Sequence, residues 1–195
     1  MKKSELREVY LKRRNSLTSD DAAEMSGRIA DRFFTEFDLV TIATLHCFIS
    51  IPKFNEVDTS LIFKRLWSEY PHIRTLAPRV DRESGELEHL PYAQQMDLIE
   101  NSWGIREPSG MASADAKQID LVLVPLLCFD RRGYRVGYGK GYYDRFLREC
   151  RTDCRKVGLS FYPPIGEIID IHAGDVALDQ CITPDKVFDL TTTSP

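Results

Sequence analysis

The feature that most restricts the fold of this chain is a set of strand-like segments with few polar residues. Residues 40–50 (VTIATLHCFIS), 119–130 (IDLVLVPLLCFD) and 156–161 (KVGLSF) are apolar along most of their length and do not alternate between apolar and polar positions. A strand of this kind is buried on both faces, which is typical of parallel sheets in α/β proteins. These segments therefore predict an α/β fold.

Segments with helical patterns lie between these strands. Thr18 stands three residues before Asp21, a spacing that caps helix starts, and acidic residues follow it in the first turn. The remaining expected helices lie within 17–37, 51–70 and 142–150, and further strands lie at 73–80 and 85–92. Apolar strands that alternate with helices predict a mostly parallel sheet covered on both faces, formed as one domain over residues 1–195.

Composition excludes several classes of protein. The chain has 195 residues, 43% of them hydrophobic, and a formal net charge of −4, so it is long and apolar enough to bury a core. The acidic balance argues against a nucleic-acid binder. The longest apolar runs are shorter than the roughly 20 residues that a membrane helix needs, and the N-terminal MKKSELREVYLKRR is too charged for a signal peptide. We expect a cytoplasmic monomer that binds small molecules and neither nucleic acid nor membrane.

The first fifteen or so residues predict a helix with a row of cations beside its apolar stripe. Lys3, Arg7 and Arg14 fall within about 40° of one another at 100° per residue. We call these three residues the cationic rail. A solvated helix face would explain the rail as well as an anion site would, so its function depends on whether an anion site exists elsewhere in the chain.

A candidate anion site follows the strand that ends near Asp130. Residues 131–141 (RRGYRVGYGKG) form a loop that connects that strand to the helix expected from Tyr142, and the part at 135–141 is here called the glycine loop. Ligands of open α/β sheets bind at the carboxyl ends of strands, and exposed backbone N–H groups before a helix start can hold phosphate oxygens. Arg135 and Lys140 would add positive charge, and Asp144 could hold Mg²⁺ beside the phosphates.

Two familiar phosphate-binding motifs do not fit the glycine loop. A P-loop would need Ser or Thr after its lysine, whereas Lys140 lies between Gly139 and Gly141. A dinucleotide fingerprint would need a glycine at Asp144. A structural glycine turn before a helix remains the alternative interpretation, which the combination of Arg135, Lys140 and Asp144 makes less favourable.

The string GYRVGYGKGYYDRFL resembles the signature of the 5-formyltetrahydrofolate cyclo-ligase family, also called methenyltetrahydrofolate synthetases. Other segments resemble that family in the same order along nearly the whole chain, which makes a chance match improbable. These segments are KSELR, NEVDTSLI, WGIREP, DLVLVPLLCFDRRGYRVGYGKGYYD, KVGLSF and GDVALDQCITPD.

The resemblance implies a three-layer α/β/α sandwich, like that of sugar-phosphate isomerases and CoA transferases. It also implies ATP- and Mg²⁺-dependent conversion of 5-formyltetrahydrofolate to 5,10-methenyltetrahydrofolate, with release of ADP and phosphate. The residues that would contact ATP are Lys3, Arg7, Arg135, Gly137, Gly139, Lys140, Gly141, Tyr142 and Tyr143. Those that would meet the folate are Ile51, Glu56, Trp103, Tyr138 and Tyr142. Asp144 and Asp175 would hold Mg²⁺, and Lys140, Arg135 and Tyr143 would serve catalysis.

This reaction suits the residues at hand, because phosphorylation of the formyl oxygen creates a leaving group and needs no nucleophilic side chain. The protein then has to position the substrates and neutralise charge. Two alternatives come from other classes. One is a non-catalytic nucleotide- or folate-binding relative of the same fold. The other is a binder of RNA or DNA that would use the basic first helix, for which interleaved stacking aromatics are lacking.

Overall fold

A computed structural model describes residues 1–81, 83–101, 104–110 and 112–191. Its α-helices are α1 (Lys3–Asn15), α2 (Ser19–Glu36), α3 (Ser60–Glu69) and α4 (Tyr142–Glu149). The strands of the main sheet are β1 (Thr44–Cys47), β2 (Arg74–Val80), β3 (Leu87–Pro91), β6 (Leu121–Pro125), β9 (Arg155–Leu159), β10 (Gln180–Ile182) and β11 (Val187–Asp189). Short elements are the strands β4 (Leu98–Glu100), β5 (Arg106–Pro108), β7 (Cys128–Phe129) and β8 (Arg135–Val136) and the 3-10 turns Pro52–Phe54 and Ala116–Gln118.

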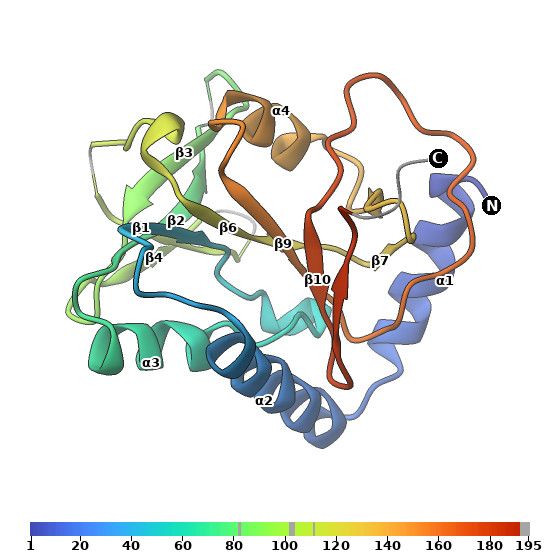
Figure 1. Ribbon diagram of the computed structural model, residues 1–195, viewed down its shortest axis with the longest axis horizontal. Coiled ribbons are helices and arrows are strands. Elements are labelled where there is room, and N and C mark those ends of the chain that lie inside the picture. Colours follow the sequence, from blue (N-terminus) through green and yellow to red (C-terminus); the bar gives the residue numbers. More distant parts are fainter. Residues whose placement is uncertain (82, 102–103, 111, 192–195) are drawn as a thin grey trace.

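The central sheet has seven strands in the order β11-β10-β9-β6-β1-β2-β3. The five inner strands run parallel, and β11 and β3 are antiparallel at the two edges. Helices α2 and α3 lie below the sheet in Figure 1, and α4 lies above it. The expected three-layer α/β/α sandwich with a mostly parallel sheet is therefore confirmed.

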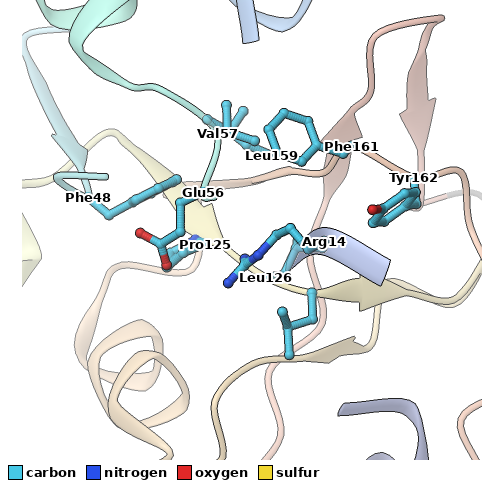
Figure 2. Close-up of a pocket in the computed structure, with 10 residues that line it drawn as sticks. Arg14, Phe48, Glu56, Val57, Pro125, Leu126, Leu159, Phe161 and Tyr162 are labelled. Carbon is cyan, nitrogen blue, oxygen red and sulfur yellow. The ribbon is translucent and has the colours of Figure 1, made fainter. Parts of the chain in front are cut away.

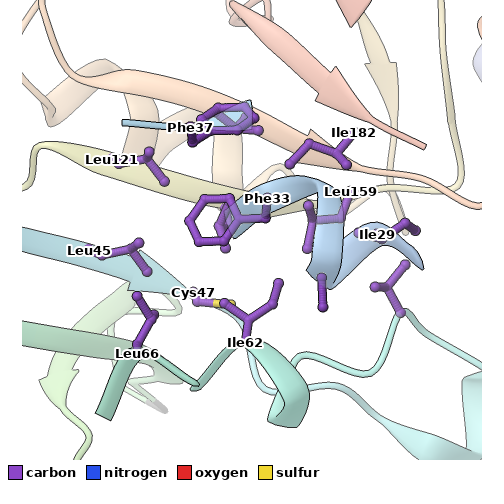
Figure 3. Packing of buried hydrophobic residues seen from close by; sticks show 14 of the residues in the cluster. Ile29, Phe33, Phe37, Leu45, Cys47, Ile62, Leu66, Leu121, Leu159 and Ile182 are labelled. Atoms are coloured by element: carbon purple, nitrogen blue, oxygen red, sulfur yellow. The ribbon is translucent and has the colours of Figure 1, made fainter. Parts of the chain in front are cut away.

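The two faces of the sheet explain the apolar strands. In β6, Leu121 and Leu123 are buried in the cluster that includes Phe33 of α2 and Ile62 of α3 (Figure 3). Val122 and Val124 point the other way and belong to a second cluster with Phe146 of α4 and Ile119. Because successive side chains of a strand point to opposite faces, a strand between two helical layers has no place for polar residues.

Some expected elements are shorter or divided. The expected strand at 119–130 is two strands, because the chain leaves the sheet after Pro125 and Cys128–Phe129 pairs with β8 in a separate hairpin. Helix α2 begins as predicted, since the Thr18 hydroxyl oxygen accepts a hydrogen bond of 3.1 Å from the Asp21 N–H. Among the described residues, no helix is both long enough and apolar enough to cross a bilayer.

The parallel strands direct several loops to one edge of the sheet. Strands β1, β6 and β9 end at Cys47, Pro125 and Leu159, and the loops that follow lie together at this carboxyl edge. Close packing there depends on Gly158, where a Cβ would lie 2.6 Å from Leu126 Cδ2 and 2.7 Å from Leu178 Cδ1. This edge carries the candidate site.

Candidate functional site

The glycine loop has the backbone that its sequence predicts. Gly139 and Gly141 have φ values of 91° and 69°, in the left-handed region that favours glycine. Gly141 is the N-cap of α4 and provides no side chain to cap the helix, so it leaves the N–H groups of the first turn without a side-chain partner of its own. Such a helix start attracts anions.

The cationic rail faces the glycine loop and the segment around Asp175, not solvent. Lys3 Nζ lies 2.5 Å from Asp175 Oδ2, and Arg7 Nε donates a hydrogen bond of 2.9 Å to the Gly137 carbonyl. Arg14 Nη2 donates to the Tyr138 hydroxyl. The predicted alignment of the three cations is confirmed, and the structure excludes a purely solvated rail.

Gly139 allows Arg7 of the cationic rail to lie close to the backbone of the glycine loop. A Cβ on this residue would lie 3.0 Å from Arg7 Cζ and 3.1 Å from Arg7 Nη2. The Arg7 guanidinium therefore lies against bare main chain. The loop and α1 form one cationic surface although they are far apart in sequence.

Arg135 is the first residue of the glycine loop, and its side chain is buried. Its Nη2 donates to Asp144 Oδ1 at 2.8 Å and its Nη1 to the Val176 carbonyl at 2.5 Å. Burial lowers the pKa of Arg135, and the neighbouring Asp144 opposes that effect. The guanidinium thus joins the start of α4 to the segment that carries Asp175. Its expected contact with ATP stays a prediction.

Asp144 and Asp175 lie close to one another, because Asp144 Oδ1 also accepts a hydrogen bond of 3.2 Å from the Val176 N–H. Asp175 Oδ2 accepts hydrogen bonds from Lys3 and from the His172 N–H. Burial raises the pKa of Asp175, but the bonds from His172 and Lys3 outweigh it and the net pKa is lowered. Within the described ranges, all of these hydrogen bonds use Asp144 Oδ1 and Asp175 Oδ2, so the second oxygen of each carboxylate takes part in none of them.

These two carboxylates fit Mg²⁺ in one respect. Mg²⁺ is commonly held by one or two carboxylates together with water and substrate phosphates. No group of three or more His, Cys, Asp or Glu side chains that could form a complete protein cage occurs in the part of the chain that the structure describes. A metal here would thus depend on ligands that the nucleotide supplies.

Lys140 and the two tyrosines after it differ in exposure. Lys140 is exposed, and its side chain has no hydrogen-bond or ion-pair partner within residues 1–81, 83–101, 104–110 and 112–191. Tyr142 is half-buried beside Arg145. The Tyr143 hydroxyl is buried with no hydrogen-bond partner among those residues, and burial raises its pKa well above the ordinary value. Tyr143 therefore presents a protonated donor, while Lys140 presents a mobile charge.

Glu56 is buried and lies in the segment that leads from β1 to α3. Its Oε2 accepts a hydrogen bond of 2.8 Å from the Ile51 N–H, and its Oε1 accepts one of 2.7 Å from the Tyr138 hydroxyl. Burial raises the pKa of Glu56, and the bonds from Tyr138 and Ile51 and the charge of Arg14 oppose that effect. Ile51, Glu56 and Tyr138, all predicted to meet the folate, are thus brought together.

A small cavity of about 10 Å³, room for about one water molecule, lies between Glu56 and Arg14 (Figure 2). Its lining comes from helix α1, from the last residues of β6 and β9, and from the loops after β1, β6 and β9. The lining residues are Arg14, Phe48, Glu56, Val57, Pro125, Leu126, Leu127, Leu159, Phe161 and Tyr162.

Sequence reasoning missed several aromatic residues of this site. The Phe54 ring lies 5.6 Å from the Tyr138 ring, and Phe161 and Tyr162 line the cavity. Phe161 and Tyr162 lie in the loop that follows β9 at its carboxyl end, two and three residues after Leu159, which is the signal that could have identified them. Trp103, predicted to meet the folate, lies outside the described residues.

The fold and the site define a class of α/β protein in which a cationic, glycine-rich loop and a buried carboxylate pocket meet at the carboxyl edge of a parallel sheet. Within this class, the 5-formyltetrahydrofolate cyclo-ligase family matches residues 1–184, and the chain belongs to that family. The resemblance found in the sequence is thereby confirmed.

Individual relatives agree with this assignment. The chain is 30% identical over 183 residues to 5-formyltetrahydrofolate cyclo-ligase of Escherichia coli strain K12, with 91% of this chain and 97% of that protein covered. It is 34% identical over 170 residues to the mitochondrial 5-formyltetrahydrofolate cyclo-ligase of Arabidopsis thaliana. That match covers 75% of this chain but only 61% of the plant protein.

Solved structures show the same fold. The NMR structure of Aquifex aeolicus 5,10-methenyltetrahydrofolate synthetase superposes with a TM-score of 0.83 at 27% identity, covering 100% of this chain and 96% of that one. A 5,10-methenyltetrahydrofolate synthetase from Mycoplasma pneumoniae superposes with a TM-score of 0.72 at 25% identity, covering 94% and 99%.

Proposed function

We propose that this protein is an ATP-dependent ligase that cyclises 5-formyltetrahydrofolate to 5,10-methenyltetrahydrofolate, releasing ADP and phosphate, with Mg²⁺ as cofactor. The observation that carries the proposal is that the glycine loop contacts both the cationic helix α1 and the buried carboxylate of Glu56. Arg7 ties α1 to the glycine loop, and the same loop reaches the buried Glu56 through Tyr138. The candidate anion site and the carboxylate pocket thus adjoin, as transfer of phosphate to a bound folate requires. Membership of the family supports the same activity.

The triphosphate of ATP would lie against the glycine loop. Lys3, Arg7 and Lys140 supply positive charge, and Gly137, Gly139, Gly141 and the start of α4 supply backbone N–H groups. The Tyr143 hydroxyl is a donor without a partner among the described residues, which suits a phosphate or formyl oxygen nearby. Arg135 would act mainly by holding Asp144 in place.

Asp144 and Asp175 would hold Mg²⁺ through Asp144 Oδ2 and Asp175 Oδ1, the oxygens that the hydrogen bonds described above leave available. When bound, the ion would neutralise phosphate charge. Lys3 already neutralises part of the charge of Asp175. ATP binding would then redistribute these cations between carboxylates and phosphates.

The folate would enter beside Glu56. A carboxylate can accept hydrogen bonds from a pterin, because the amino group and the ring N–H of the pterin are two donors on the same edge of the ring. The backbone N–H of Ile51 orients Glu56 for this contact. Tyr138, Tyr142 and Trp103 would offer aromatic faces to the rings.

The chemistry transfers the terminal phosphoryl group of ATP to the formyl oxygen and leaves ADP. The lone pair of N10 then attacks the formyl carbon, N10 loses its proton, and the bond from carbon to the phosphorylated oxygen breaks as phosphate leaves. No side chain forms a covalent bond in this sequence. The chain positions both substrates and balances the charge that develops on the phosphoryl oxygens.

The direct test is to mix the purified protein with 5-formyltetrahydrofolate, ATP and Mg²⁺ and to follow the new near-ultraviolet absorbance of the methenyl product. We expect product only when all three components are present. Normal binding of ATP and folate without product formation would favour the non-catalytic relative instead.

The nucleic-acid alternative receives less support, because all three cations of the rail contact groups of the chain itself. A salt titration of any binding to RNA or DNA tests it. Several phosphate contacts would give a steep loss of affinity with salt, whereas we expect no measurable binding at physiological salt.

A further inference from the structure

Arg14 is an unusual residue for the end of a surface helix, because it is only 4% exposed. Its Nη2 donates to the Tyr138 hydroxyl, but its Nε is buried and has no hydrogen-bond partner in the part of the chain that the structure describes. A buried guanidinium with an unused donor is costly unless a further group pairs with it. Arg14 and Glu56 line a cavity with room for about one water molecule, so a single oxygen atom of a ligand could pair with Arg14 there.

Glu56 and Arg14 share one partner. The Tyr138 hydroxyl donates to Glu56 Oε1 at 2.7 Å and accepts from Arg14 Nη2, so a single oxygen satisfies an acid and a cation at once. Figure 2 shows the side chains of Glu56 and Arg14, which come from different segments of the chain and point toward the same space. The site therefore presents an acceptor and a donor that lie next to each other.

A cyclic amide matches this pattern better than a single hydroxyl does. Its ring N–H would donate to Glu56, and its adjacent oxo oxygen would accept from Arg14, including the unused Nε. The pterin ring of a folate carries such an edge, with the 4-oxo group beside N3–H. We infer that Arg14 is a specificity-determining residue that binds the 4-oxo group of the pterin, and that the Tyr138 hydroxyl holds this place until the substrate displaces it.

This inference rests on the proposed function and deepens it, because it assigns a selectivity to the folate site. A 4-amino pteridine would direct N–H groups toward the Arg14 donors and would offer no N3–H to Glu56 in its neutral form. A site that pairs with a substrate group discriminates strongly against an analogue that leaves its buried groups unpaired. We expect the protein to prefer the 4-oxo form by about 10- to 100-fold, as the loss of a charged hydrogen bond implies.

The experiment compares two probes that differ only at this position, folic acid and its 4-amino-4-deoxy analogue aminopterin. Their dissociation constants are measured by titration calorimetry with the full chain. Arg14→Met should weaken folic acid binding and bring the ratio of the two constants close to one. Lys12→Met, which removes an exposed cation from the same helix, should keep the wild-type ratio.

Two further variants separate Arg14 from its neighbours. Tyr138→Phe removes the hydroxyl but leaves Arg14 and Glu56, so it should retain the preference for folic acid. Arg14→Lys keeps the buried charge and should lose only part of the preference, which serves as the test if Arg14→Met does not fold by circular dichroism.

Equal affinity of the wild-type protein for the two probes would overturn the inference, as would an unchanged ratio in both Arg14 variants. A Tyr138→Phe variant that lost the preference would also overturn it, since the tyrosine would then be the residue that discriminates. Cyclisation of 5-formyltetrahydrofolate by the same wild-type preparation is measured in parallel. Product formation without 4-oxo preference refutes this inference alone, whereas absence of product refutes the proposed function.

Discussion

At the scale of single residues, the glycines of the loop differ in what they permit. Gly139 has a left-handed φ of 91° and lies against Arg7, whereas a Cβ on Gly137 would meet nothing within 4 Å. Gly139→Ala should therefore lower the free energy of unfolding by about 1–2 kcal/mol through backbone strain. Urea unfolding checks this, and Gly137→Ala is the control for stability. Equal losses for the two variants would contradict the steric explanation.

Lys140 is the residue whose side chain is most plainly available to a ligand. Because Lys140 is exposed, Lys140→Ala should leave the fold intact but remove the charge that the proposed mechanism places beside the phosphoryl oxygens in the transition state. We expect kcat to fall about 100-fold or more, by analogy with loss of one transition-state donor. Steady-state rates of methenyl formation measure this. Lys64→Ala, an exposed lysine on α3, should leave the rate unchanged, and a similar fall there would point to an unspecific cause.

At the same scale, the sequence placed Lys140 and Asp144 after the carboxyl end of a strand, and its resemblance to the family marked Glu56 as a folate contact, but neither showed the partners of these residues. Glycine spacing and a following helix are local signals, so the loop could be predicted directly. The burial of Arg135 could not, because its contacts with Asp144 and Val176 depend on how distant loops pack. An isolated arginine beside glycines looks the same in sequence whether it faces a ligand or the core.

At the scale of elements, strand β9 packs against two loops through Gly158. A Cβ there would lie 2.6 Å from Leu126 Cδ2 and 2.7 Å from Leu178 Cδ1, so Gly158→Ala should destabilise the protein by about 1–3 kcal/mol. Gly27→Ala in α2 is the matched control, because nothing lies within 4 Å of its Cβ position. That variant should stabilise by about 0.5–1 kcal/mol through helix propensity. Thermal unfolding distinguishes the two, and equal shifts would contradict the packing argument.

Helix α1 shows what helical periodicity can and cannot predict. The spacing of Lys3, Arg7 and Arg14 is sufficient to place them on one helix face. Only the fold revealed that this face meets residues 137, 138 and 175. An amphipathic pattern determines which side chains lie together, but the partner surface comes from elements more than a hundred residues away.

At the scale of the whole molecule, two histidines lie buried between the sheet and α4. The rings of His46 and His89 have centroids 5.2 Å apart, and Phe146 of α4 lies 4.0 Å from His89. His46 has no hydrogen-bond partner on either ring nitrogen among the described residues. Burial lowers the pKa of His89 to about 4, with Glu88 opposing weakly, and burial lowers that of His46 well below its ordinary value.

This pair makes stability depend on pH in a definite direction. Between about pH 6.5 and 4 the unfolded chain binds protons that the folded chain does not, so stability present at pH 7 is lost as the pH falls. His89 contributes a slope that approaches about 1.4 kcal/mol per pH unit in that window, and the lowered pKa of His46 acts in the same direction. Urea unfolding at about pH 7, 6 and 5 should show the loss, and His89→Phe should reduce the slope. His72→Phe, a change at an exposed position, should not reduce the slope. A slope that stays unchanged in His89→Phe would contradict the assignment of this pH dependence to the buried histidines.

The sequence by itself determined the layers of this protein and the position of its glycine loop. Apolar strands, helix periodicity and glycine spacing are properties of neighbouring residues, so they can be recognised without knowing what packs against them. The tertiary structure alone decided that Arg14 and Glu56 meet at one hydroxyl, because Tyr138 is 124 residues from the first and 82 from the second. Contacts over such separations form only when the parallel strands bring their carboxyl ends to a common edge.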